Sequence, residues 1–533
     1  SFSISIFKKC CSLNQNSGAI FVFMKEKVYS FDIFDTLIMR KTIEPCGIFL
    51  FVQEKLQNID MPEFLKNNFT LIRREAEYYT QKNTLELTGR FDCKLDDIYK
   101  TIQKNYLLSD ELTEKIKHLE IQEEIDSAFP VIQNIKRVKS LSAGGKKVIL
   151  ISDMYLNSDI IRKILVNIDK FFENIEIYVS SDTGKRKSNG SLYRLIQEKY
   201  DIIEHTGDNR FSDIIQAEWN KIKSINFKPE KLMPYEKKLL EKNKDSVFIQ
   251  KSAGISRILR QNNGREKIFN FAVSFAAPVI YSYADWILKE ALRRDIKTLY
   301  FISRDGYVPK IISDIIIKNR QYGIKTRYFY SSRRASRIAD EKNIDIFINQ
   351  IFSELKNFQT NEFIAQRLGI SEDELKNAGG MNKEKLLSNN EFKNLVIERN
   401  KKKRELFLKY INQEINFNEK FGFVDLNGLG RTQDNLAQLI NKEITSFYFN
   451  LQTDMHFSEN SIKSAYINSI NLNSLILELL CRTLDGQTLE YKEENGLIKP
   501  VLEYEKNMLM EKWGFDEYIE GIKAYTEMIS RET

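Results

Sequence analysis

The sequence predicts an α/β protein with two α/β domains, the first of which carries a helical insertion. Between residues 27 and 228, short runs of β-branched and apolar residues alternate with longer amphipathic stretches. This alternation favours βαβ units and a parallel sheet. A second alternation of the same kind begins after a charged segment near residue 229. The 533 residues allow two to four domains at roughly 150 residues each, so the length fits this organisation.

The first domain is expected to span residues 24–228 and to contain five strands. The strand candidates are residues 28–34 (VYSFDIF), 146–152 (KKVILIS), 175–181 (IEIYVSS), 202–207 (IIEHTG) and 221–227 (KIKSINF). More than a hundred residues with helical periodicity separate the first candidate from the second. Because one crossover helix cannot fill a segment of this length, we expect a helical cap at about 41–140.

The second α/β domain is expected at 268–533, after a linker at 229–267. The linker segment is rich in charged residues and contains two prolines, which is typical of a helical linker. The strand candidates of the second domain are residues 297–303, 325–331, 421–426 and 446–451. Residues 1–23, ahead of Met24, are interpreted as a leader or a disordered segment.

The most apolar stretch of the chain, 268–288, is expected to be a buried core helix. It contains Asn270, Pro278 and Asp285. A charge near the middle of a bilayer costs on the order of several kcal/mol, so the core helix is favoured over a membrane span.

Composition and charge narrow the function classes. The 81 Lys and Arg against 74 Asp and Glu leave a net charge of +7, and the basic residues interleave with acids. Binding to nucleic acid is therefore not expected. The five cysteines and three histidines show no metal-ligand spacing, which argues against a zinc site. We expect a cytoplasmic protein without a transmembrane segment, for which peripheral contact with a membrane stays open.

Polar side chains with complementary chemistry end or follow the first four strands. They are Asp32, Asp35 and Thr36 at the first, Ser152 and Asp153 at the second, Lys185 and Lys187 at the third, and Asp208 and Asp213 at the fourth. The carboxyl ends of parallel strands share one edge of a sheet, where ligands bind. A nucleophilic carboxylate, a hydroxyl and lysine for phosphate oxygens, and acids for Mg²⁺ predict a phosphoryl-transfer site. Each residue alone has a simpler interpretation as a turn former, a helix cap or a solvated charge.

The stretches SFDIFDTLI, LISDM, KSNGSLY and GDNRFSD resemble the four motifs of the haloacid dehalogenase (HAD) superfamily, in order, over residues 28–228. The resemblance implies a Rossmann-like HAD core whose mobile helical cap is inserted after the first strand. It implies that Asp32 is the covalent nucleophile and that Ser152 binds phosphate. Lys187 would neutralise the aspartyl-phosphate, and Lys185 is the rival for that role.

The resemblance also implies a magnesium site. Its ligands would be Asp32, the main-chain carbonyl of Phe34 and Asp208, and Asp213 would support the metal waters. Phe34 stands where the family usually has a second Asp that acts as general acid and base. Such proton transfer is typically worth about 10²–10⁴-fold in rate, and Phe cannot perform it. Asp35 and Asp153 are candidates to replace it; otherwise the domain is a slow phosphatase or binds phosphate without turnover.

Two motifs of the second domain predict a second site for an anionic ligand. The residues are Arg304 and Asp305 after one strand, Arg333, Arg334 and Arg337 after the next, and Gly428, Gly430, Arg431 and Thr432 between a strand and a helix. Glycines in such a turn let backbone N–H groups approach an anion, and Arg binds phosphate or carboxylate with two hydrogen bonds. The simpler interpretation is a tight turn with surface arginines. Glu478 and Glu490 are further candidate site acids, or a buried polar residue and a solvated charge.

The stretch SFDIFDTLI is followed in order by YFISRDGY, VDLNGLGRTQ and ELLCRTLDGQTLEYKEENGLIKPVLE. With these stretches, nearly the whole chain resembles large bacterial HAD-type predicted hydrolases that are associated with surface-polysaccharide and capsule synthesis. We therefore expect a Mg²⁺-dependent phosphohydrolase acting on a phosphorylated sugar, a nucleotide sugar or a related glycan precursor. One alternative is a glycosyl- or phosphoryl-transferase whose active site lies in the second domain, with an accessory HAD domain. Another is a binding or scaffolding protein in which both sites are degenerate.

Overall fold

The computed structural model describes residues 25–90, 92–264, 266–353, 360–451, 460–469 and 474–531 of the chain. Contacts divide the chain into two compact units. Unit 1 contains the residues up to 231 together with 244–250, and unit 2 contains 232–243 and the residues from 251 onward. The leader expected at 1–23 lies outside the described residues.

Unit 1 is built on one sheet of parallel strands. They are β1 (Glu26–Phe31), β4 (Lys147–Ser152), β5 (Glu176–Val179), β6 (Tyr200–Gly207) and β7 (Lys223–Asn226). Each overlaps one of the strand candidates, so these strand predictions are confirmed. In the order β5-β4-β1-β6-β7, the chain runs to one side of β1 for β4 and β5 and to the other side for β6 and β7. Ligands of open parallel sheets bind at such a switch point, which here lies between the carboxyl ends of β1 and β6.

Amphipathic helices connect these strands, and their apolar spacing explains how they pack. In α6 (Ser158–Ile168), Ile161, Ile164 and Leu165 are buried three and four residues apart, so they share one face against the core. The side chain of Asn157 caps the start of α6 by accepting a hydrogen bond from the N–H of Ile160 at 2.9 Å.

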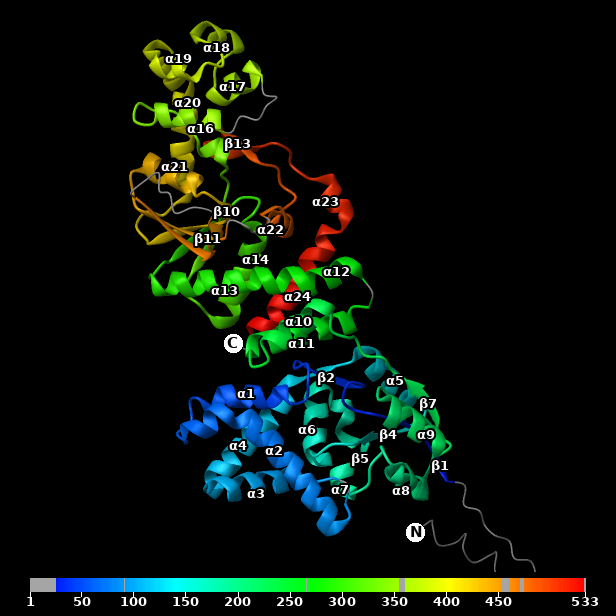
Figure 1. The fold of residues 1–533 in the computed structure, drawn as a ribbon. Coiled ribbons are helices and arrows are strands. Elements are labelled where there is room, and N and C mark those ends of the chain that lie inside the picture. Colours follow the sequence, from blue (N-terminus) through cyan, green and yellow to red (C-terminus); the bar gives the residue numbers. More distant parts are fainter. Residues whose placement is uncertain are drawn as a thin grey trace, which may run out of the picture. The chain divides into compact units, whose positions relative to one another are not determined.

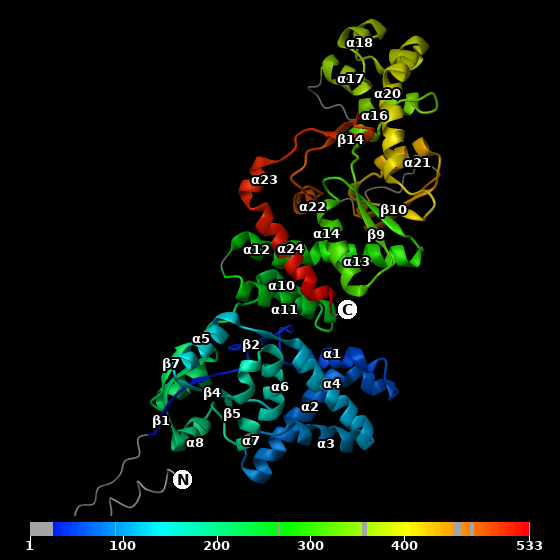
Figure 2. The same cartoon turned by 180° about the vertical axis from the view of Figure 1, so that it is seen from behind.

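A group of helices lies between β1 and β4, as the sequence predicts. In the described part of the chain it consists of α1 (Gly47–Leu56), α2 (Glu63–Thr88), α3 (Leu95–Tyr106) and α4 (Asp110–Ser127). The chain leaves and re-enters the core through β2 (Ile38–Arg40) and β3 (Ala128–Pro130), which pair antiparallel. Figures 1 and 2 show these helices gathered on the side of unit 1 away from α8 (Ser191–Lys199) and β7. The insertion is therefore a separate helical layer joined to the sheet by a short ribbon.

A buried ion pair holds this cap together. Arg73 on α2 and Glu120 on α4 are both 0% exposed, and the guanidinium Nε and Nη2 donate to the carboxylate at 2.7 and 2.8 Å. Glu120 also accepts a hydrogen bond from the Tyr99 hydroxyl on α3 at 2.7 Å. The Arg73 guanidinium lies 4.4 Å from the centre of the Phe49 ring on α1. It also lies 6.0 Å from the centre of the Tyr99 ring, so one arginine contacts side chains from three other helices of the cap.

Unit 2 contains a second parallel sheet, with the order β12-β11-β10-β8-β9. Its strands are β8 (Thr298–Ile302), β9 (Lys325–Phe329), β10 (Phe421–Gly428), β11 (Ile444–Leu451) and β12 (Ser461–Ile467). The first four confirm the strand predictions, and the fold class predicted from the sequence, with two α/β sheets, is confirmed. β12 was not predicted, because this edge strand (SIKSAYI) is largely exposed and has little apolar signal.

The expected linker region, 229–267, contains two helices. They are α10 (Pro234–Lys242) and α11 (Val247–Asn262), and α10 and most of α11 belong to unit 2. The guanidinium of Arg260 on α11 ion-pairs with Glu236 on α10 at 2.9 Å, and both side chains are buried. A buried pair of this kind fixes the two helices to each other.

The apolar stretch forms the central helix of unit 2. It continues from α12 (Lys267–Phe271) through a π-helical turn into α13 (Ala277–Arg293), and Ile280, Tyr283 and Ile287 are among its fully buried residues. The helix 267–293 is long and apolar enough to cross a membrane by length and composition, and 61% of its most apolar window is buried. In the core it packs with α14 (Tyr307–Arg320) and α24 (Phe515–Ser530).

A second group of helices lies between β9 and β10. It comprises α16 (Ile344–Ser353), α17 (Asn361–Leu368), α18 (Glu372–Ala378), α19 (Lys383–Ser388) and α20 (Asn390–Glu414). These helices share a small apolar core of their own, and Figure 1 shows α17, α18 and α19 close together. The helix-like patterns predicted for this gap are confirmed.

Candidate active site

Asp32 lies at the switch point of the first sheet, directly after β1. Its N–H donates to the carbonyl of Thr206 on β6 at 2.8 Å, which carries the strand pairing one residue beyond β1. The chain then turns sharply, because the N–H of Leu37 returns to the carbonyl of Ile33 at 2.8 Å. Asp35 takes a left-handed conformation in this turn, with φ +55°, which Asp tolerates better than most residues. The turn is what brings Thr36 back beside Asp32.

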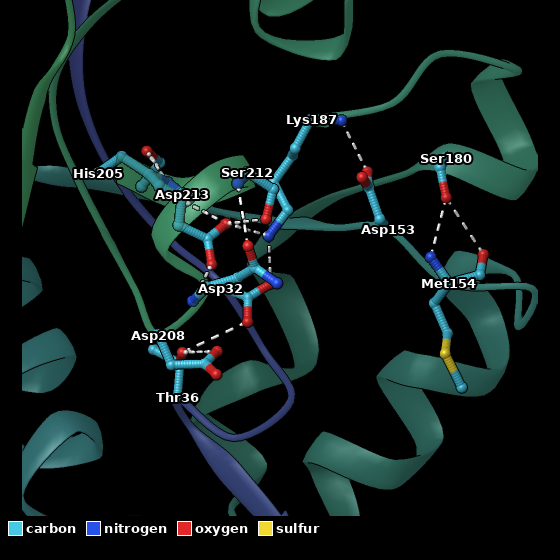
Figure 3. A network of polar contacts seen from close by, with 12 residues as sticks. Asp32, Thr36, Asp153, Met154, Ser180, Lys187, His205, Asp208, Ser212 and Asp213 are labelled. Atoms are coloured by element: carbon cyan, nitrogen blue, oxygen red, sulfur yellow. Dashed lines mark hydrogen bonds and ion pairs between the residues drawn. The ribbon is translucent and has the colours of Figure 1, made fainter. Parts of the chain in front are cut away.

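Lys187 joins two of the predicted acids. Its ammonium ion-pairs with Asp32 Oδ1 and with Asp213 Oδ1, the latter at 2.6 Å, and the lysine is 2% exposed (Figure 3). Lys185, the rival in the sequence, is exposed. Geometry therefore favours Lys187 as the lysine of this site.

The backbone of Lys187 is fixed by Asp153. The Asp153 carboxylate accepts hydrogen bonds from the N–H of Lys187 at 2.8 Å and from the N–H of Ser188 at 3.2 Å. Both of its oxygens are thus engaged, and burial raises the pKa of this carboxyl. Asp153 positions the lysine, which leaves Asp35 as the better placed of the two candidate proton carriers.

The carboxylate of Asp213 has several polar partners within the protein. Besides Lys187, its carboxylate accepts hydrogen bonds from His205 Nε2 at 3.3 Å and from the N–H of Asn209 at 3.0 Å. Burial would raise the pKa of Asp213, but the charge of Lys187 and the hydrogen bond from His205 outweigh it and lower that pKa. His205 is itself fully buried, and burial lowers its pKa.

His205 is the residue that sequence reasoning missed. It has no partner at metal-ligand spacing, so its sequence context does not assign it to a site. The signal was its place two residues before the end of β6, where side chains alternate between the faces of the sheet. On that strand His205 shares a face with Gly207, against which the Asp213 carboxylate packs so closely that a Cβ would lie 2.5 Å or less from it.

The hydroxyl of Thr36 lies between the carboxylates of Asp208 and Asp32. Thr36 Oγ1 lies 3.3 Å from Asp32 Oδ2 and 3.2 Å from Asp208 Oδ1 (Figure 3). The hydroxyl has one hydrogen to donate, so one of the two carboxylate contacts lacks a proton at any moment. Burial, together with the neighbouring charges of Asp35 and Asp213, raises the pKa of Asp208 to about 6.

The acids of this cluster fit a divalent cation. Asp32, Asp208 and Asp213 each offer an oxygen atom, and the three atoms lie within 4.8 Å of one another. Lys187 supplies one positive charge against these carboxylates, and burial raises the pKa of Asp32 well above its ordinary value despite that ion pair. An all-oxygen donor set with unbalanced negative charge is the environment that Mg²⁺ takes in proteins.

Two further predicted residues lie beside the cluster. Ser152 is the last residue of β4, the strand next to β1, and it is 2% exposed. Phe34 points its ring at Arg40, whose guanidinium lies 4.0 Å from the ring centre and pairs with Glu124 at 2.7 Å. The position at which the sequence resemblance implies a proton-transferring acid is thus part of an aromatic and ionic contact at the base of the cap.

Unit 2 holds a cavity of about 530 Å³ at its own switch point. The chain runs from β8 to β9 on one side and from β10 to β12 on the other, and the cavity lies at the carboxyl ends of β8, β9 and β10. All six residues predicted to bind substrate here line it: Arg304, Asp305, Gly428, Gly430, Arg431 and Thr432. Of the other candidates, Arg333, Arg334 and Glu478 also line this cavity, whereas Arg337 and Glu490 line a neighbouring one.

Asp305, in the wall of this cavity, makes the stability of unit 2 depend on pH. Burial, with the charges of Asp425 and Glu478, outweighs Arg304 and raises the pKa of Asp305 to about 7 from an ordinary 3.8. The folded state therefore keeps a proton that the unfolded state loses, so stability falls as pH rises from about 4 to about 7. We expect Asp305→Asn to stabilise unit 2 by about 2–4 kcal/mol near pH 8 and by less than half of that near pH 5. Calorimetry of both proteins at the two pH values tests this; an equal effect at both would contradict it.

No model of a known protein family and no curated protein matches the chain. Solved structures similar to it include a dehalogenase with 12% identity and a TM-score of 0.26, which covers 38% of this chain and 85% of its own. A predicted phosphoglycolate phosphatase from Haemophilus somnus 129pt has 14% identity and a TM-score of 0.25, with 38% and 86% covered. The HAD-hydrolase YfnB from Bacillus subtilis, bound to magnesium, has 14% identity and a TM-score of 0.25, with 38% and 87% covered. At these scores the likenesses carry no conclusion about function, which rests on the geometry above.

Proposed function

We propose that unit 1 is a Mg²⁺-dependent phosphohydrolase that acts through a phosphoryl group carried on Asp32. The observation that supports this most is the contact of Lys187 with both Asp32 and Asp213, beside Asp208, at the switch point of a parallel sheet. If these residues only formed turns or lay in solvent, the lysine would not be buried between two carboxylates. Burying a charge costs hydration energy, which the other charges of the cluster must compensate.

In the proposed reaction each residue of the cluster has its own role. One carboxylate oxygen of Asp32 attacks phosphorus, and the bond from phosphorus to the leaving oxygen of the substrate breaks, with a proton needed on that oxygen. Water then attacks phosphorus, which releases inorganic phosphate and restores the carboxylate. Lys187 holds the charge of the reacting group, and Asp153 and Asp213 hold Lys187. A cation at Asp32, the Phe34 carbonyl and Asp208 would offset the negative charge and polarise the phosphoryl oxygens.

The leaving oxygen receives its proton without help from residue 34. Phe34 packs against Arg40 and has no proton to give. Asp35, at the same turn and partly exposed, is the proposed substitute. A substrate whose leaving group needs little protonation, such as an aryl phosphate, should therefore be turned over faster than an alkyl phosphate.

The proposed substrates are phosphorylated sugars or related glycan precursors in a cytoplasmic step of surface-polysaccharide synthesis. This finer part of the proposal is supported by the sequence resemblance alone. A transferase whose site lies in unit 2 is the second candidate, and the observation that favours it is the arginine-lined cavity at the switch point of the second sheet.

Removal of the metal tests the proposed function. With Mg²⁺ present, we expect the protein to release phosphate from members of a panel of phosphosugars and aryl phosphates. This release should disappear with EDTA and return when Mg²⁺ is added back. Asp208→Asn should raise the Mg²⁺ concentration needed for half-maximal release by about tenfold or more, because a ligand is lost. Asp201→Asn, at an exposed position of the same strand, is the matched control and should behave as the wild type.

Two results would count against the proposal. Phosphate release that continues at the same rate in EDTA would exclude the metal from it. No release from any compound of the panel would remove the phosphohydrolase and leave the transferase or a binding role.

A further inference from the structure

We propose that the cavity of unit 2 binds a phosphorylated sugar that carries no nucleobase. This site is separate from the acid cluster of unit 1 and does not depend on the function proposed there.

Arginines reach the cavity from four segments of unit 2. Arg304 follows β8, Arg333 and Arg334 follow β9, Arg367 lies on α17, and Arg431 opens α21 (Arg431–Ile440). The same walls contain three carboxylates, so the cavity has an excess of positive charge. Guanidinium groups arriving from several directions suit a phosphate group, whose oxygens accept hydrogen bonds on all sides.

The turn that presents Arg304 is strained and tightly built. Arg304 has φ +69°, a left-handed conformation that costs a non-glycine residue on the order of 1 kcal/mol. Its N–H donates to the Tyr328 hydroxyl at 2.7 Å, which holds the turn. A Cβ on Gly306 would lie 2.4 Å from the carbonyl oxygen of Ile302, so only glycine fits there. Strain that the surroundings maintain in this way is typical of a binding site.

A glycine loop forms the opposite wall. Gly428 has φ +141° and Gly430 has φ +72°, and the loop leads into the first turn of α21. A Cβ on Gly430 would lie 2.6 Å from Cε of Lys463, which pairs with Asp434 beneath the loop at 2.7 Å. Backbone N–H groups at the start of α21 are therefore held at the cavity wall, where they add to the attraction for an anion.

The acids of the cavity supply a second kind of contact. Asp305 Oδ1 is buried and has no hydrogen-bond partner within the part of the chain that the structure describes. Asp425 is held in place, since it accepts a hydrogen bond from Gln433 Nε2 at 2.9 Å. At a pH where these acids are ionised they cannot donate, so a ligand that satisfies them must bring hydroxyl or amine hydrogens. A sugar bearing a phosphate offers both halves: oxygens for the arginines and hydroxyls for the acids.

The walls contain no aromatic side chain among the described residues. Nucleobases are usually held by stacking on aromatic rings, which contributes about 1–3 kcal/mol per base. Among the described residues that line the cavity, this lack of a ring favours a sugar phosphate over a nucleotide sugar.

Titration calorimetry of the full chain in EDTA tests this inference. We expect glucose 6-phosphate to bind about tenfold or more tightly than either glucose or inorganic phosphate, because it fills both halves of the cavity. Arg333→Ala and Arg334→Ala should each weaken binding about tenfold or more, since each removes a charged hydrogen-bond donor. Arg333 is exposed, so its substitution does not put folding at risk. Arg293→Ala, an exposed arginine at the end of α13, is the matched control and should bind as the wild type.

A second pair of compounds tests whether a nucleobase contributes to binding. The variant Asp208→Asn tests whether the ligand binds in unit 1 instead of unit 2. Uridine 5′-monophosphate should bind no more tightly than ribose 5-phosphate, because a base finds no ring to stack on. Tighter binding of the nucleotide would overturn the inference. So would binding that Asp208→Asn abolishes while both arginine variants leave it unchanged, since the sugar phosphate would then occupy unit 1. Loss of phosphatase activity with intact binding would overturn only the function proposed for unit 1.

Discussion

Asp32→Asn is expected to reduce phosphate release by about 10⁴-fold or more, the scale of loss seen when an enzyme loses its covalent nucleophile. The amide has nearly the shape of the carboxylate but no anionic oxygen to attack phosphorus. Lys187 keeps Asp213 as a partner, so the variant should fold normally. Steady-state phosphate release with saturating Mg²⁺ measures the effect, and near-wild-type hydrogen exchange of unit 1 confirms that the fold is intact.

The matched control for this variant is Asp201→Asn, which removes an exposed carboxylate from β6 at the other end of the strand from Asp208. It should leave phosphate release unchanged. If Asp32→Asn retained more than about a tenth of the wild-type rate, a nucleophilic role of Asp32 would be wrong, because such a loss is far below that for a nucleophile.

Arg73→Leu is expected to destabilise unit 1 by about 3–5 kcal/mol, because it leaves Glu120 charged and buried with a hydroxyl in place of its ion-pair partner. Arg73→Leu combined with Glu120→Leu should recover much of this loss, since the one carboxylate that then lacks Arg73, Glu77, is 36% exposed and keeps contact with water. Urea unfolding followed through hydrogen exchange of peptides from α2, α3 and α4 reports on this part of the chain alone. Arg74→Leu, at the exposed neighbouring position, should change stability little.

Two outcomes would contradict the prediction for Arg73. If Arg73→Leu and Arg74→Leu destabilised the cap equally, the buried pair would contribute no more than a surface charge. If the double substitution were as unstable as the single one, shape and not charge would explain the role of Arg73.

The strands could be predicted because each is a short apolar run between amphipathic segments, as KKVILIS illustrates. The chemistry at their ends followed from sheet geometry, since Asp32 and Asp208 come after strands that proved to be neighbours. β12 escaped prediction because an exposed edge strand has no continuous apolar pattern. The sequence could not tell that Arg73 is a core residue while Arg74 is exposed, because that depends on where Glu120 lies after folding.

The same limit applied to His205 and Asp153. His205 contacts the side chain of Asp213 and Asp153 accepts from the backbone N–H of Lys187, and tertiary structure brings these partners together. In unit 2 the grouping of Arg304 with the glycine loop could be expected from the strand ends. The contribution of Arg367 could not, because α17 belongs to the helical group inserted between β9 and β10.

The central claim is that a phosphoryl group is carried on Asp32. Its most direct test is mass spectrometry of the full chain, quenched in acid after brief mixing with a phosphosugar or aryl phosphate and Mg²⁺. We expect one added phosphoryl group on the peptide that contains Asp32, and none when EDTA replaces Mg²⁺. Substrate turned over with no label on that peptide at any mixing time, or a label on another residue, would contradict the claim.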